Sequence, residues 1–349
     1  MNKLTKVGLS ALCGSLAAVS NANAGDMTVT GGVDMSWMSL GSKSTTGNPI
    51  GMGSNLTFKG DGELDNGWTF GVTVAMLNND AYSNTAINID MQSLGKLNFN
   101  QGDSGNGIDA LDDKMPTAWE EPWGMGLGTG IKLVSGIGPQ NNAQYTTPTF
   151  MGTTITVAAA PDMGSADVSD KATSGQTTDS TGAGYDATIN VNPSLGTEIL
   201  SGLNIFVGAH YTKNYVDSTP GNDTYEGTGG ITFDIGPISL GYQASGVSTG
   251  KNTTASDVDW YKNKAFGIAF NINDDLSVSY GKHESRQGFV NPNDTESVNL
   301  EVESFQAAYS MGGVSIRLAD TEVDNAAYQV ETAGLYDKEA TVLSVSLAF

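Results

Sequence analysis

Apolar and polar residues alternate along this chain from one end to the other. Near the N-terminus the pattern covers Met27–Trp37, and near the C-terminus it covers Leu343–Phe349, with comparable stretches between them. Because neighbouring side chains of a β-strand point to opposite faces of the sheet, strict alternation predicts strands with one apolar and one polar face. Sixteen such segments begin near residues 26, 53, 67, 85, 95, 142, 153, 184, 201, 224, 238, 259, 275, 297, 314 and 339.

The connections between these segments alternate between short and long. Asp65–Gly67 and Gly236–Pro237 are short turn sequences, whereas Asp162–Gly182 and Asp320–Glu339 are long and polar. Short turns on one rim and long loops on the other are typical of transmembrane β-barrels. An even number of strands also places both termini on the same rim.

A soluble β-sandwich also alternates, so the polar faces decide between the two folds. They carry charged or titratable residues such as Asp34, His210 and Arg317. These suit a wet lumen and would be very costly in a dry core. We therefore predict an all-β protein, a 16-stranded antiparallel transmembrane β-barrel wide enough to leave an aqueous channel. The alternation breaks phase from Val302 to Phe305, which predicts a β-bulge.

The first 24 residues have the features of a secretory signal peptide. Lys3 and Lys6 precede a short apolar segment, and Ala22–Ala24 forms an A-x-A cleavage site. The apolar segment, ~13 residues long, is too short for a membrane anchor. We expect residues 1–24 to be removed on export and residues 25–349 to form one barrel domain. The single cysteine, Cys13, lies in the removed part.

Composition narrows the classes of function. Only 38% of the residues are hydrophobic and 15% are charged, which is too polar for a bundle of membrane helices. Glycine accounts for 45 of 349 residues, against a usual share of ~7%, as expected for many strands joined by loops. Without Lys3 and Lys6, 14 basic residues remain against 38 acidic ones. This balance excludes a nucleic acid partner and favours surfaces that attract cations.

The sequence offers little material for catalysis or for a metal site. His210 and His283 are the only histidines, and neither has a partner at the spacing of a transition-metal site. An enzyme in such a barrel would need a Ser–His or Asp–His pair. We expect His210 to line the lumen and His283 to be solvated at a strand end, and hence no enzyme, no cofactor and no metal site. For acidic pairs such as Asp112 and Asp113, Ca²⁺ binding is an alternative to plain surface charge.

Three stretches of the chain resemble one family. Gly53–Val74 is similar to the second and third strands of the general-diffusion porins of Gram-negative bacteria, in particular the Neisseria/Burkholderia-type branch. Asn141–Val157 resembles the strand after that family's constriction loop, and the alternation up to Phe349 resembles its C-terminal assembly signal. The resemblance implies an outer-membrane homotrimer with a third external loop folded inward. It also implies contact with outer-membrane lipid and lipopolysaccharide, with the barrel-assembly machinery and with small polar solutes.

The longest connection, about residues 102–141, is the candidate constriction loop, because loops of this length are commonly functional. The acidic side of the expected constriction consists of Asp103, Asp109, Asp112, Asp113, Glu120 and Glu121. The resemblance implies basic side chains facing them, in a narrow constriction that focuses the field on passing ions. Strand phase assigns Lys59, Arg317 and Lys96 to this basic wall. Gln144 stands where relatives often carry an arginine, which weakens the basic side.

Together these features predict passive diffusion of small hydrophilic solutes and ions across the outer membrane, with cations preferred. Two alternatives remain within this fold. One is a substrate-specific channel, for instance for cationic nutrients. The other is a structural or adhesive surface barrel with a blocked lumen. For the acidic residues of the loop, the alternative is that they only solvate the loop surface.

Overall fold

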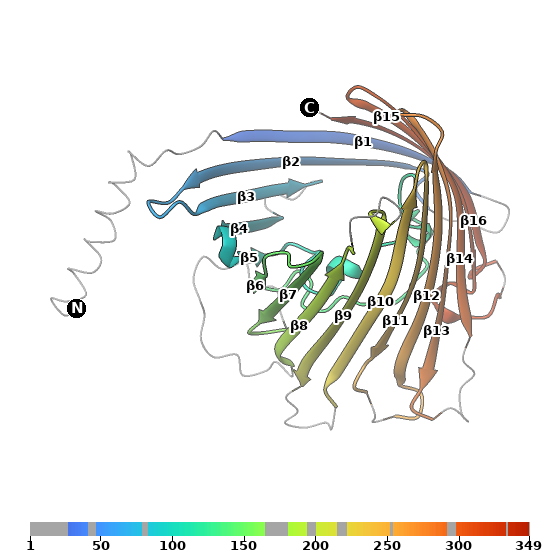
Figure 1. The fold of residues 1–349 in the computed structure, drawn as a ribbon. Helices are drawn as coiled ribbons and strands as arrows, with labels where there is room; N and C mark the ends of the chain where they lie inside the picture. The colour runs from blue at the N-terminus through green and yellow to red at the C-terminus, as the bar shows by residue number, and fades with distance from the viewer. Residues whose placement is uncertain are drawn as a thin grey trace, which may run out of the picture.

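The computed structural model describes residues 27–40, 47–78, 83–164, 181–193, 200–214, 222–251, 254–291, 298–332 and 334–348. In this part of the chain, 16 antiparallel strands close into one barrel, because each strand pairs with its sequence neighbours and β1 pairs with β16 (Figure 1). The strands are β1 (Thr28–Leu40), β2 (Ile50–Glu63), β3 (Thr69–Leu77), β4 (Asn84–Asp90), β5 (Lys96–Gln101), β6 (Asn142–Thr146), β7 (Thr153–Ala160), β8 (Thr181–Val191), β9 (Leu203–Asn214), β10 (Thr224–Ile235), β11 (Ile238–Ser248), β12 (Val258–Asn271), β13 (Leu276–Phe289), β14 (Asn299–Met311), β15 (Val314–Asp324) and β16 (Lys338–Ala348). The predicted fold class is confirmed, and each predicted strand start lies within three residues of the observed one.

The alternation of the sequence becomes the two faces of the wall. On β1, Val33, Met35 and Trp37 point outward and are 43–50% exposed, while Asp34 and Ser36 point into the lumen and are less exposed. The same arrangement recurs around the barrel, because a step of one residue along a strand reverses the face. None of the helices in the described ranges is long and apolar enough to cross a membrane.

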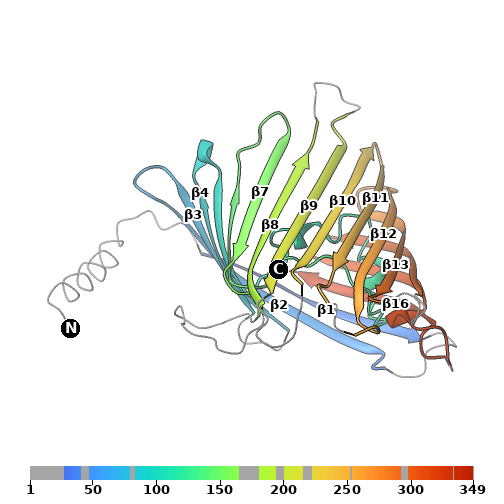
Figure 2. The ribbon, with the colours of Figure 1, turned by 90° about the horizontal axis from the view of Figure 1, so that it is seen from below.

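The two rims differ as the connections predicted. Gly236–Pro237 joins β10 to β11 and Gly312–Gly313 joins β14 to β15, both in tight turns, while long connections leave the opposite rim. Two of the long connections enter the lumen. We name residues 102–141, between β5 and β6, L3, and residues 325–337, between β15 and β16, L8. The teal and green path of L3 is visible inside the barrel in Figures 1 and 2.

The wall of the barrel is uneven in height. β4, β5 and β6 contain only seven, six and five residues, whereas β12 and β13 contain 14 each. Since a strand rises ~3.3 Å per residue, the wall around β12 and β13 is more than twice as tall as the wall around β6. Figure 2 shows the tall strands β9 to β13 on one side of the barrel.

The bulge predicted between Val302 and Phe305 is wrong. The register of β14 with both neighbours runs without interruption through these residues. Val302 and Leu300 are instead fully buried on the lumen side, where they pack against L8. The apolar residues that seemed out of phase therefore mark a dry contact inside the barrel. Among the described pairings, register shifts occur in β12 at Val258/Trp260 and in β8 near Thr181.

Candidate constriction site in the barrel lumen

L3 lies flat against the inner wall over several strands. Its Pro116 sits on two inward-facing glycines, Gly241 of β11 and Gly267 of β12, where an added Cβ would overlap the proline. Leu111 and Met115 bury their side chains against Phe206 and Ala265 of the wall. Because Phe206 points inward, the lumen is not polar throughout. Phe206 and Ala265 are inward apolar positions that L3 covers.

A buried carboxylate on β8 holds both arms of L3. Oδ2 of Asp186 accepts hydrogen bonds from the backbone N–H of Ile108 at 2.8 Å and of Ile137 at 3.2 Å. Its other oxygen lies 2.5 Å from Nδ1 of His210, and the carboxylate is only 4% exposed. Hydrogen bonds to an ionised acceptor are stronger than neutral ones. Asp186 therefore fastens the beginning and the end of L3 to the same point of the wall.

A second wall carboxylate supports the returning arm. Oε2 of Glu226 on β10 accepts the backbone N–H groups of Ser135 at 2.7 Å and Gly136 at 2.9 Å. Gly136 and Gly107 have φ values of +50° and +59°, and a Cβ at either would overlap the Asp186 carboxylate. Only glycine allows the backbone to approach an acceptor so closely in this conformation. The glycines of L3 thus permit its docking.

The middle of L3 is fastened to β13 and β14. Oε1 of Gln306 accepts the N–H groups of Trp119 and Glu120, both at 3.1 Å, and its Nε2 donates to the Glu120 carbonyl at 2.6 Å. Oγ of Ser279 accepts the N–H of Ala118 at 2.8 Å. Neutral side chains hold this part of the loop, so its own carboxylates are not used as anchors.

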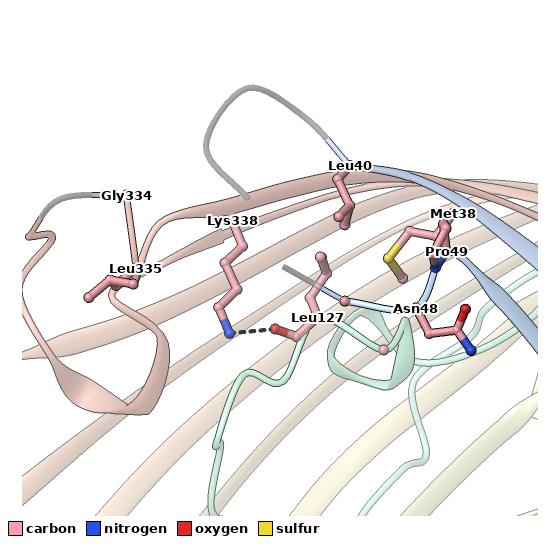
Figure 3. Close-up of a pocket in the computed structure, with 10 residues that line it drawn as sticks. Met38, Leu40, Asn48, Pro49, Leu127, Gly334, Leu335 and Lys338 are labelled. Carbon is pink, nitrogen blue, oxygen red and sulfur yellow. Dashed lines mark hydrogen bonds between the residues drawn. The ribbon is translucent and has the colours of Figure 1, made fainter. Parts of the chain in front are cut away.

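The returning arm of L3 also meets L8 and the last strand. Nζ of Lys338 donates to the carbonyls of Leu127 at 2.7 Å and Gly128 at 2.9 Å, beside a hollow of about 250 Å³ (Figure 3). The hydroxyl of Tyr328 accepts the N–H of Lys132 at 3.0 Å. The dry cluster below consists of Leu127, Leu300, Val302, Val323, Ala326, Tyr328, Ala340 and Val342. Two loops therefore pack together over β14 to β16.

Five of the six predicted acidic residues lie close enough to influence one another. Burial, followed by the charges of Asp113 and Asp109, raises the pKa of Asp112 to about 8. Burial, a hydrogen bond with Glu120 and the charge of Asp113 raise the pKa of Glu121 to about 8. Burial also raises the pKa of Asp109. Asp113 thus links both ends of one cluster, in which desolvation and mutual repulsion disfavour full ionisation.

Asp103 lies apart from this cluster. It sits at the start of L3, where its Oδ1 accepts a hydrogen bond from the Asn84 side chain at 3.2 Å. Burial alone raises its pKa, and none of the other L3 carboxylates contributes. Asp103 is placed to hold the loop base on β4.

The three predicted basic residues occupy three different places. Lys96 is at the short-turn rim and pairs with Asp90 at 3.1 Å. Arg317 pairs with Asp34 and lies over the Trp119 ring, 5.2 Å from its centroid. Lys59 is exposed on the lumen side of β2 and has no carboxylate within 4.0 Å among the described residues. The structure does not bring them together as one basic wall.

The rest of the wall from β2 to β6 is mostly neutral. The inward residues that lie beside Lys59 across successive strands, from β3 to β6, are Thr73, Ala86, Asn100 and Asn142. In the next row, Gln144 is occupied by L3, because its Oε1 accepts the Gly107 N–H at 2.9 Å. No ladder of cations therefore faces L3 from the described part of these strands.

The histidines are placed differently from the sequence-based expectation in one case. His210 does face inward. Its Nδ1 contacts the Asp186 carboxylate, and its Nε2 lies 2.6 Å from the Thr212 hydroxyl. This acid–imidazole–hydroxyl order resembles a hydrolase triad, but Thr212 is only 5% exposed and Asp186 is engaged by L3. The prediction that His283 is solvated at a strand end is wrong, because its side chain lies within β13 and the residue is only 2% exposed. No group of three or more metal-ligating side chains occurs in the described ranges.

Sequence reasoning missed the wall residues that hold L3. Asp186, Glu226 and Gln306 are 49 to 187 residues away from the backbone groups that they bind. A signal for the first two did exist: each is a carboxylate at an inward-phase position of a strand. Nothing in the sequence pairs them with particular N–H groups of L3.

A closed barrel with a loop fastened inside its lumen defines the class of β-barrel channel proteins. Residues 8–310 match the family model of Gram-negative porins, and the chain belongs to this family. The protein is therefore an outer-membrane diffusion channel, and the predicted family is confirmed. Among curated proteins, no sequence matches significantly.

Solved structures agree with this assignment at the level of the fold. The anion-selective porin from Comamonas acidovorans is 13% identical, with a TM-score of 0.62 and 93% of this chain and 99% of that chain covered. OmpF of Salmonella typhi, in complex with daunomycin, is 12% identical, with a TM-score of 0.65 and coverage of 93% and 97%. The trimer form of OmpT of Vibrio cholerae is 10% identical, with a TM-score of 0.62 and coverage of 94% and 100%.

Proposed function

We propose that this porin passes small hydrophilic solutes and ions passively and prefers cations. The observation that carries this proposal is the cluster of five interacting carboxylates on L3, inside the lumen and without a facing ladder of cations in the described wall. Fixed negative charge at a narrow, low-dielectric passage raises the local concentration of cations. The name of the anion-selective relative describes that protein alone, since only the fold is shared.

The test is a triple variant, Asp109→Asn, Asp112→Asn and Asp113→Asn, in planar bilayers. The reversal potential in a salt gradient should show a lower cation preference, measured at pH 9 so that the wild-type acids are ionised. The effect should be several-fold in 10 mM salt and small at 1 M, because the Debye length falls from about 30 Å to about 3 Å.

A matched control removes three carboxylates from the outer face of β15, where Asp320, Glu322 and Asp324 point away from the lumen. Asp320→Asn, Glu322→Gln and Asp324→Asn together should leave the reversal potential nearly unchanged. An unmoved potential in the L3 variant would show that this cluster does not control ion flow. Anion preference of the unaltered protein would contradict the electrostatic reasoning as a whole.

Two other functions remain to be distinguished by the same measurement. A structural or adhesive barrel would give no stepwise conductance, whereas an open pore gives ohmic steps. A substrate-specific channel would be blocked by its solute at low concentration, and a general pore would not. We propose neither of these two functions but a general pore without catalytic activity, cofactor or metal, and we treat Ca²⁺ on the L3 acids as an adventitious event.

The assembly that we propose is a homotrimer, supported by the trimer form of the Vibrio cholerae relative. Residues 1–24 would be cleaved on export, and the barrel-assembly machinery would recognise the C-terminal strand ending in Phe349. Both the leader and Phe349 lie outside the described residues. Lys59 is the basic wall residue that we propose to act opposite the L3 acids, while Lys96 and Arg317 are neutralised by their own partners.

A further inference from the structure

Another hollow lies inside the barrel, between L3 and the short-turn rim. It measures about 260 Å³ and is lined by Trp119 of L3 and by inward side chains of the wall. Its floor is one row of paired residues across β12 to β15, namely Asn271, Ser277, Ala308 and Arg317. We name this space the rim hollow.

Small side chains keep the rim hollow open. Between its two ends the wall carries Ser277, Ala308, Ser310 and Ser315. L3 does not fill the space, because its backbone is held one row higher. There the N–H of Ala118 donates to Oγ of Ser279 at 2.8 Å, and the N–H of Trp119 donates to Oε1 of Gln306 at 3.1 Å. L3 therefore forms a roof over the rim hollow.

One end of the rim hollow is formed by Arg317 and Trp119. The guanidinium donates to the Asp34 carboxylate and lies 5.2 Å from the centroid of the Trp119 ring, so both contacts fix its position. A guanidinium carries five N–H donors. Among the described residues, Asp34 is the only hydrogen-bond partner of Arg317. This end of the rim hollow can therefore donate further hydrogen bonds.

The other end is the turn between β12 and β13. Asp274 and Asp275 are exposed there, and within the described ranges neither carboxylate forms an ion pair or a hydrogen bond. The backbone of the turn is fixed. Oδ1 of Asn273 accepts the N–H groups of Asp275 and Leu276, both at 2.9 Å, and the carbonyl of Asp275 accepts the N–H of Ser310 at 2.8 Å. This end thus presents acceptors from a well-held position.

The rim hollow thus offers donors at one end, acceptors at the other and serine hydroxyls between them. A solute hydroxyl is both a donor and an acceptor, so an array of hydroxyls can bind along the whole hollow. The two carboxylates of the turn repel an anion, and a simple cation leaves the Arg317 donors without an acceptor. The carboxylate of a zwitterion has to compete with Asp34 for Arg317. The Trp119 ring adds an apolar surface for C–H groups.

We propose that the rim hollow binds a neutral polyhydroxylated solute of the size of one sugar ring. Its volume lies below the range of about 300–1,000 Å³ that is typical of small-molecule pockets, which limits the solute to a single ring. Short turns mark the periplasmic rim, so the solute binds after it has passed L3. Binding is weak, with a millimolar dissociation constant, because a channel solute must also leave. The proposal rests on the proposed pore for the arrival of the solute, but not on its ion preference.

The test measures binding of D-glucose to the full chain by saturation-transfer NMR, in a detergent without a sugar headgroup. Glycine is the zwitterionic probe, and tetraethylene glycol is a neutral probe with hydroxyls only at its ends. Glucose should saturate the protein at millimolar concentration. The other two should bind about 10-fold more weakly or less, because a site that hydrogen-bonds several hydroxyls rejects solutes that lack them.

Two variants alter the rim hollow in different ways. Asp274→Ala with Asp275→Ala removes the charged acceptors and should weaken glucose binding on the order of 10-fold. Ala308→Leu fills the floor without removing a polar group and should abolish binding. The matched control, Asp61→Ala with Asp65→Ala, makes the same change of charge near the turn between β2 and β3. It should bind glucose as the wild type does, and far-UV circular dichroism should show a folded barrel in all three.

Three outcomes would overturn the proposal. They are unchanged glucose binding in either hollow variant, an equal loss in the control, and tighter binding of glycine than of glucose. Conductance in planar bilayers is measured separately. A lack of conductance steps would contradict the proposed pore and leave the binding result standing, whereas ohmic steps without glucose binding would contradict only the rim hollow.

Discussion

Asp186 offers the most direct test of how L3 is kept on the wall. Replacing it by alanine removes the acceptor of the Ile108 and Ile137 N–H groups, which both arms of the loop present to one oxygen. A hydrogen bond to a charged group contributes about 1.5–3 kcal/mol. The two bonds together therefore stabilise the docked loop by on the order of 3–6 kcal/mol. Asp186→Asn keeps an oxygen acceptor without the charge, so its effect should be smaller.

Hydrogen exchange measures this free energy at the two amides themselves. A loss of 3–6 kcal/mol corresponds to roughly 10²- to 10⁴-fold faster exchange at Ile108 and Ile137 when exchange reports the opening equilibrium. Single-channel records should also become noisier, because a released loop moves within the pore. The control is Asp234→Ala, an inward carboxylate of β10 that accepts a hydrogen bond from Ser239 and contacts no part of L3 in the described structure.

Two outcomes would refute the reasoning. Unchanged exchange at both amides in Asp186→Ala would show that the apolar clusters alone hold L3. Equal acceleration in Asp234→Ala would show that the loss of any lumen carboxylate loosens the barrel. If the charge of Asp186 contributes beyond its shape, exchange should be fastest in Asp186→Ala, intermediate in Asp186→Asn and slowest in the wild type.

Further predictions concern pH and assembly. Since the pKa values of Asp112 and Glu121 are raised to about 8, both groups are neutral below that pH and charged above it. Cation preference should therefore be greater at pH 9 than at pH 6, and Asp112→Asn with Glu121→Gln should flatten this dependence; a larger preference at pH 6 would contradict it. Deleting Phe349 should lower the amount of the protein in the outer membrane and leave protease-sensitive chain in the periplasm. A normal amount at the cell surface would show that Phe349 serves only in packing.

Local pattern determined most of the architecture. The period of two that places Val33, Met35 and Trp37 outside is a property of extended backbone, so it can be read from neighbouring residues alone. The turn sequences, the length of L3 and the closeness of Asp109, Asp112 and Asp113 are local in the same sense. For that reason strand number, strand starts and the acidic character of L3 follow from the sequence.

The tertiary structure decided which groups meet across the lumen. The strand pattern places Arg317 on the inward face, as expected for a cation of the pore wall. Closure of β1 onto β16 nevertheless brings it to Asp34, 283 residues away, which neutralises its charge. Leu300 and Val302 violate the polar-inside pattern, because L8 and L3 cover them and exclude water. Asp186 binds L3 only because the loop turns back over β8. Such pairings depend on the path of a long loop. Contacts between residues distant in sequence fix that path, and local backbone preference does not.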